Sequence, residues 1–133
     1  MAAVTITNAG LNLLRDAING VLVNGRVIDA TVYYIAIGTS STAPAATDTQ
    51  LGAEVFRKRT TAWANGAAAG EGLITMYLSP SESGGTVITE VGWFAGNTAT
   101  MTPNSGIMIA RALYSHTHIV NQESIQFQLD SII

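Results

Sequence analysis

After residue 30 the chain consists of short β-type segments with no helix-period segment between them. Six stretches are rich in β-branched and aromatic residues or alternate apolar with polar positions, and turn residues separate them. These stretches are 31–38, 55–63, 72–78, 86–94, 107–114 and 123–132. Successive strands without intervening helices pair antiparallel. The sequence therefore predicts a mainly β fold, with an antiparallel β-sandwich or a jelly-roll-like barrel over residues 31–133.

A single α-helix is predicted before these strands, over residues 7–24. Thr7 or Asn8 supplies an N-cap, and Gly25 is a natural terminator. Apolar residues recur at helical spacing at Leu11, Leu14, Ile18 and Leu22. We expect this stripe to pack on the domain's own sheet, and the alternative is that it faces a neighbouring subunit. Residues 1–133 are expected to form one domain.

Charged residues are scarce for a soluble domain. They make up 11% of the 133 residues, while apolar residues make up 47%; an average domain has about 25% charged residues. A surface with few charges costs little to desolvate, which suits a packed assembly. The same composition also suits an ordinary uncharged β-protein surface.

Several partner classes are not expected. The net charge is −3, and Arg57-Lys58-Arg59 holds half of the six basic residues. So few positive charges could neutralise few phosphates, and nucleic acid is not expected as a partner. The chain has no cysteine, which excludes disulfides, thiolate metal sites and thiol nucleophiles. A signal-peptide pattern and an apolar run of about 20 residues are both missing, so no membrane association is expected.

Ordered landmarks along the chain resemble the phage tail-collar fibre domain family. They are Ile6-Thr7-Asn8-Ala9-Gly10, Ile35-Ala36-Ile37-Gly38-Thr39, Ala43-Pro44 with Thr49-Gln50-Leu51, Glu54-Val55-Phe56-Arg57-Lys58, and the run GGTVITEVGWF from Gly84 to Phe94. The resemblance implies a structural protein of a tailed-phage virion, located in the virion and made in the host cytoplasm. It also implies docking on other virion proteins and assembly as a homo-oligomer, with a trimer expected.

The residues shared with that family have structural interpretations. Gly38 and Gly84-Gly85 are expected to supply positive φ or close backbone approach. Gly10 opens the predicted helix, and Gly92 lies in the strand that carries the EVGWF motif. The charges of Glu54, Arg57 and Glu90 have two interpretations. They form ion pairs where strands meet loops, or they are ordinary solvated charges.

Catalytic motifs are missing: the sequence has no G-x-S-x-G elbow, HExxH, P-loop or dinucleotide fingerprint. We therefore expect neither enzymatic activity nor a cofactor. His116 and His118 are candidate metal ligands around a three-fold axis, and a solvated pair in a loop is the favoured alternative. Trp63 and Trp93 are expected in the core, and a glycan-stacking role is the alternative.

The most favoured function is a tail or baseplate component that attaches fibres or acts as an adaptor. A fibre protein would continue into a shaft, whereas this sequence stops at Ile133. A capsid decoration (cement) protein that binds the major capsid protein is therefore the second hypothesis. A carbohydrate-binding receptor module is the third.

Overall fold

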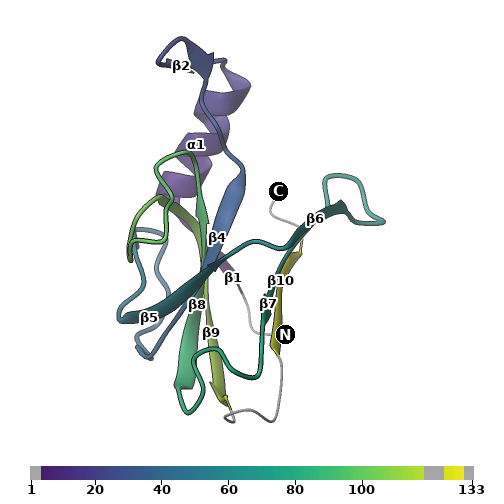
Figure 1. Ribbon diagram of the computed structural model, residues 1–133. Coiled ribbons are helices and arrows are strands. Elements are labelled where there is room, and N and C mark those ends of the chain that lie inside the picture. The colour runs from purple at the N-terminus through teal and green to yellow at the C-terminus, as the bar shows by residue number, and fades with distance from the viewer. Residues whose placement is uncertain (1–3, 119–124, 131–133) are drawn as a thin grey trace.

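The computed structural model describes residues 4–118 and 125–130 (Figure 1). It is mainly β, with one helix near the N-terminus and antiparallel pairing throughout the sheets. These features of the predicted fold class are confirmed. The ends of the predicted last strand, residues 123–124 and 131–132, lie outside the described residues. No described helix is long and apolar enough to cross a bilayer.

The helix α1 spans Asn8–Ile18, so its predicted extension to residue 24 is wrong. Thr7 is the N-cap, and its side chain accepts a hydrogen bond from the Gly10 backbone N–H. Beyond the helix, the chain forms a hairpin of β2 (Leu22–Val23) and β3 (Arg26–Val27). Its turn residues Asn24 and Gly25 have φ values of 53° and 79°. Asn-Gly readily adopts this two-residue turn, and β-branched neighbours favour strands over a further helical turn.

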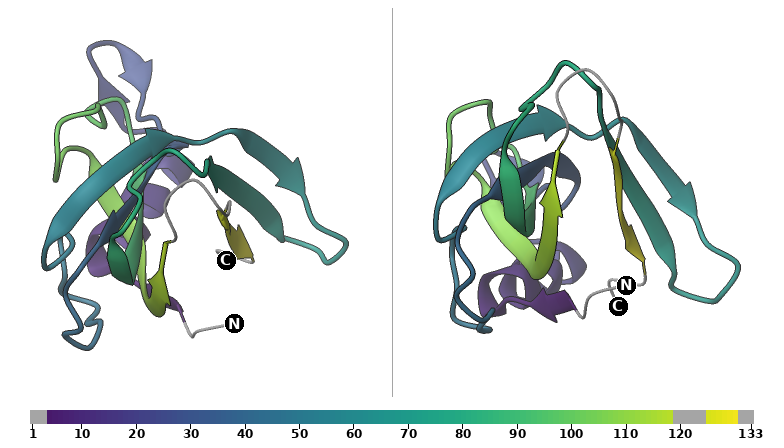
Figure 2. Two further views of the ribbon diagram at one scale, coloured as in Figure 1. Left: turned by 60° about the horizontal axis from the view of Figure 1, so that its bottom comes forward. Right: turned by 90° about the horizontal axis from the view of Figure 1, so that it is seen from below.

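Five strands form the larger sheet, in the order β1-β9-β8-β4-β5. Their bounds are Val4–Ile6 for β1, Ile107–Thr117 for β9, Val87–Ala95 for β8, Val32–Gly38 for β4 and Glu54–Arg59 for β5. The smaller sheet has the order β10-β7-β6. Its strands are Ile125–Asp130 for β10, Gly72–Leu78 for β7 and Ala62–Asn65 for β6. The two sheets face one another in a sandwich-like arrangement (Figure 2).

The predicted strand 55–63 is two strands in two sheets. The division falls at Thr60 and Thr61, whose backbone N–H groups donate to different sheets. Thr60 donates to the Tyr33 carbonyl in β4, and Thr61 donates to the Thr75 carbonyl in β7. The chain thus crosses from one layer of the sandwich to the other without a turn signal in its sequence.

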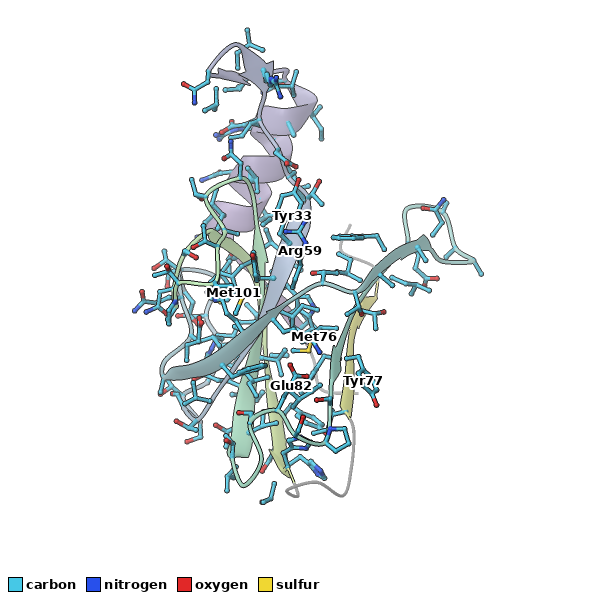
Figure 3. All side chains as sticks on the ribbon, viewed as in Figure 1. Tyr33, Arg59, Met76, Tyr77, Glu82 and Met101 are labelled. Carbon is cyan, nitrogen blue, oxygen red and sulfur yellow. The ribbon has the colours of Figure 1, made fainter. Side chains whose placement is uncertain are left out.

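The main core lies between the sheets. The larger sheet contributes buried side chains that include Ile35, Ile37 and Trp93, and the smaller sheet contributes Met76 and Leu78. In Figure 3, Met76 points from β7 toward the larger sheet. Burial of Trp93, 4% exposed, confirms the core prediction for that residue.

The opposite face of the larger sheet is covered by two loops, residues 39–53 and 97–106. The helix lies against β9, where a Cβ on Gly10 would come within 2.7 Å of the Ile109 Cα. Leu51 from the first loop and Ala99 from the second pack with Phe94 and Met108 in a second apolar cluster. We call the side of the sheet that the two loops cover the outer face.

Candidate functional site

Two buried ion pairs lie on the outer face. The first joins Glu54 and Arg57, both in β5, whose side chains are 2% and 1% exposed. The contact is bidentate: Arg57 Nε lies 2.7 Å from one carboxylate oxygen, and Nη2 lies 2.8 Å from the other. Parallel N–H···O bonds of this kind are the strongest geometry available to an arginine.

The first pair holds the loop 97–106 in place. Arg57 Nη1 donates to the carbonyls of Thr100 and Ser105, each at 3.0 Å. The Glu54 carboxylate accepts a hydrogen bond from the Asn104 backbone N–H. The guanidinium also lies 4.4 Å from the centroid of the Phe94 ring. The hydrogen bonds that Glu54 and Arg57 make beyond each other thus go to one loop and hold it in place.

The second pair joins Glu90 in β8 to Arg111 in β9, and the side chains are 0% and 2% exposed. Arg111 Nη2 lies 3.0 Å from Glu90 Oε1. Arg111 also reaches Asp48 at 3.3 Å and the Thr42 carbonyl at 2.9 Å. Both of these partners belong to the loop 39–53, so this pair fastens the second covering loop.

The Glu90 carboxylate also accepts three backbone hydrogen bonds from the chain that covers it. Ser40 and Ala53 donate to Oε2 at 3.0 and 2.8 Å, and Gly52 donates to Oε1 at 2.8 Å. Of the two interpretations of the motif charges, the structure shows the ion pairs.

Arg111 was not singled out from the sequence as a site residue. The available signal was that it is the one charge in the otherwise apolar run 107–114.

Close approach explains three of the motif glycines. A Cβ on Gly38 would lie 2.4 Å from Glu90 Oε2. A Cβ on Gly92 would lie 2.9 Å from the Leu51 side chain. Gly10 has its tight contact with β9. The motif residues Gly38, Glu54, Arg57, Glu90 and Gly92 thus all lie on or beside the outer face.

Gly84 and Gly85 lie apart from this group, in the turn between β7 and β8. The positive φ values of that turn belong to Ser83, at 54°, and Gly85, at 82°. The Gly85 N–H donates to the His118 carbonyl at 2.7 Å, which ties the turn to the end of β9. The expected turn geometry is therefore present at Gly85.

His116 and His118 have different surroundings. His118 is fully buried, and its Nε2 lies 3.0 Å from the Ser79 carbonyl. His116 is partly exposed, and its ring centroid lies 6.0 Å from that of Tyr114. The favoured interpretation, a solvated pair, is wrong for His118. Among the side chains that the structure describes, no three His, Asp or Glu residues are placed to hold a metal ion together.

Comparisons with known proteins add no relative. No protein-family model, curated protein or solved structure matches the chain.

Half of the exposed large apolar side chains in the described part of the chain gather around one helix and the hairpin that follows it. There α1 leads into the β2–β3 hairpin, at the top of Figure 1. Six of the twelve exposed large apolar residues found in the described part of the chain lie here. They are Leu11, Ile18, Val21, Leu22, Val23 and Val27, and we call them the helix–hairpin tip. The expectation that the helical stripe packs on the domain's own sheet is therefore wrong for three of its four members.

The reason is the orientation of the helix. Leu13 is the apolar residue of α1 that is buried, at 2% exposure, and Gly10 is on the same side against β9. Leu11 and Ile18 point away from the sheet, with exposures of 53% and 83%. Together with the half-buried Leu14, they line a shallow apolar groove along the outside of the helix.

Trp63 was expected in the core, but it is 47% exposed on β6. Its Nε1–H donates to the Val32 carbonyl at 2.9 Å. This bond crosses from the smaller sheet to β4 in the larger one and fixes the orientation of the indole. Nearly half of this large aromatic residue is thus open to solvent, and the indole is held by a hydrogen bond.

Proposed function

We propose that this chain is a non-enzymatic structural protein of a tailed-phage virion that docks on other virion proteins. Its favoured place is the tail or baseplate, where it attaches fibres or acts as an adaptor. The observation that carries the docking role is the helix–hairpin tip. It is an exposed aliphatic surface on a chain with 11% charged residues. Exposed apolar surface of this extent on a soluble domain is typical of protein–protein contact sites.

The outer face supports the proposal because it is built for rigidity. Each of the two ion pairs fastens a covering loop, and the motif glycines allow the loops and the helix to approach the sheet closely. Buried pairs cost desolvation energy, and what these two provide in return is the fixed position of each covering loop. The rigid sheet supports α1, which lies against β9 and leads into the helix–hairpin tip, and a docking surface on a rigid support loses less freedom on binding.

The same contacts support a non-catalytic role. A catalytic acid, base or nucleophile needs a polar atom directed at a substrate. The carboxylates of Glu54 and Glu90 and the guanidinium groups of Arg57 and Arg111 are instead bound to one another and to loop backbone. These buried ionisable groups are thus engaged in holding the fold.

The proposal is tested on purified phage particles from a host in which the encoding gene is expressed. Antibodies against this chain, applied as immunogold label, are expected to mark the tail or baseplate. Label distributed over the head would instead establish the capsid decoration alternative. Absence of the chain from mature particles, by label and by mass spectrometry, would refute a structural role in the virion.

One observation favours a second candidate, a carbohydrate-binding receptor module. Trp63 presents an oriented indole to solvent, and indoles stack on the apolar faces of sugars. Soluble glycans from the host surface are expected to quench the fluorescence of Trp63 and to leave that of the buried Trp93 unchanged. The Trp63→Phe variant is the control, because its remaining emission comes from Trp93 alone. Quenching of equal size in that variant would contradict glycan binding at Trp63.

A further inference from the structure

The helix–hairpin tip is held together as one unit by backbone hydrogen bonds. Val21 N–H donates to the Asp16 carbonyl at 2.9 Å, which joins the segment after the helix to the last turn of α1. Ile28 N–H donates to the Val21 carbonyl at 2.8 Å, which closes the base of the hairpin. The exposed side chains of the helix and of the hairpin are therefore carried on a continuous, hydrogen-bonded support.

The exposed area of this unit is large enough for a stable interface. Val23 faces the side of the hairpin opposite to Leu22 and Val27, because Leu22 pairs with Val27 and Val23 pairs with Arg26. The other five aliphatic side chains, with exposures from 40% to 83%, correspond to about 500 Å², within the range of the largest apolar patches on monomers. Apolar atoms make up about 65% of homodimer interfaces. On that proportion the tip would support an interface of about 800 Å² per copy, which equals the roughly 800 Å² of standard complexes.

The charges around the tip decide what kind of partner fits. Residues 8–30 carry Arg15, Arg26, Asp16 and Asp29, so this segment has no net charge, although the whole chain carries −3. Arg15 is exposed and pairs with Asp16 at 2.9 Å. A surface with equal numbers of both signs can meet an identical surface in a two-fold arrangement, where each residue contacts a different residue of the other copy. It offers no attraction to a strongly charged partner.

We infer that the helix–hairpin tip is a self-association surface whose occupant is the same surface of a second copy of this chain. In this arrangement Leu11 and Ile18 of one copy fill the shallow groove along α1 of the other, and the exposed side chains of the hairpins extend the contact. The inference names the partner of the proposed docking surface and to that extent rests on the proposed function. It replaces the expected trimer with a contact between pairs of copies.

The test is the mass of the purified chain measured by sedimentation equilibrium over a range of concentrations, for the wild type and two variants. The wild type is expected to form dimers. The double variant Ile18→Lys/Leu22→Lys alters two side chains that are 83% and 62% exposed, so the fold should tolerate it. Because each substitution enters a two-fold interface twice, self-association should weaken by at least about a hundredfold.

Met101→Lys is the matched control, since Met101 is 60% exposed on the loop 97–106, away from the tip (Figure 3). It should dimerise like the wild type. Circular dichroism verifies the fold of each variant, and the single variant Ile18→Lys replaces the double one if the latter does not fold. A wild type that stays monomeric at millimolar concentration would overturn the inference. So would a dimer that the tip substitutions leave intact.

The two proposals fail separately. If the wild type is monomeric and the tip variants no longer bind to phage particles, the tip docks on a different virion protein. The self-association inference is then wrong, and the virion role stands. If dimerisation depends on the tip but the chain is absent from particles, the inference stands and the virion role is wrong.

Discussion

The substitution Glu90→Gln tests how much the buried Glu90 carboxylate stabilises the fold, because it changes the hydrogen bonding of the side chain with almost no change in its shape. The side chain is 0% exposed and accepts hydrogen bonds from three backbone N–H groups as well as from Arg111. In glutamine one of the two oxygens becomes an NH₂ group, which donates rather than accepts. Whichever way the amide is oriented, two donors lose their acceptor.

The expected loss in the free energy of unfolding follows from this number of donors without an acceptor. Each buried donor left without an acceptor costs about 1–3 kcal/mol, and breaking a buried ion pair costs about 3–5 kcal/mol. Gly52 and Ala53 lie at the surface, where water can replace part of what is lost. We therefore expect the lower end, a loss of about 3 kcal/mol in the free energy of unfolding. With a slope of about 2 kcal/mol per molar urea, the midpoint falls by about 1.5 M.

The assay is equilibrium urea unfolding followed by circular dichroism and tryptophan fluorescence. Asp16→Asn is the control, because Asp16 also pairs with an arginine but does so at the surface, where a pair contributes about 0–1 kcal/mol. Limited proteolysis of the Glu90→Gln variant should also give earlier cleavage within residues 39–53. If the midpoint falls no further than in the control, Glu90 does not hold the covering loop and the reasoning is wrong.

Two further predictions use the same equilibrium measurement. Gly38→Ala should lower the free energy of unfolding by about 1–3 kcal/mol, because its Cβ would meet the Glu90 carboxylate at 2.4 Å. Gly72→Ala is the control and should leave the free energy of unfolding nearly unchanged, since a Cβ there would have nothing within 4 Å. Equal losses in the two variants would contradict this account. For Glu82, burial raises the pKa, but hydrogen bonds from Lys58 and the backbone outweigh it and lower the pKa below its ordinary value of 4.5. A lowered folded-state pKa contributes stability that is present above pH 4.5 and is lost as the pH falls through the folded-state pKa. Urea midpoints of Lys58→Met measured from pH 7 to pH 3 should therefore fall less steeply than those of the wild type, and parallel curves would show that the pair is not coupled to folding.

Local sequence patterns determined much of the secondary structure. The cap at Thr7 and the strand Gly72–Leu78 both follow from short-range preferences, and the structure has them where the sequence predicts. The start and end of the other central strands differ from prediction by few residues. Such features depend on neighbours within a few positions, so the sequence alone can specify them.

The tertiary structure decided which segments that are far apart in the sequence come into contact, and which side chains they bury. Glu90 and Arg111 are 21 residues apart, and only the pairing of β8 with β9 brings them together over the loop 39–53. Trp63 follows the alternation of a core strand, yet the crossing between sheets at Thr60 leaves it half exposed. The helical stripe faces solvent because Gly10, which has no side chain to keep the strand away, sets the face that approaches β9. Hydrophobic pattern tells which residues can be buried, but the contacts available after pairing determine which of them are.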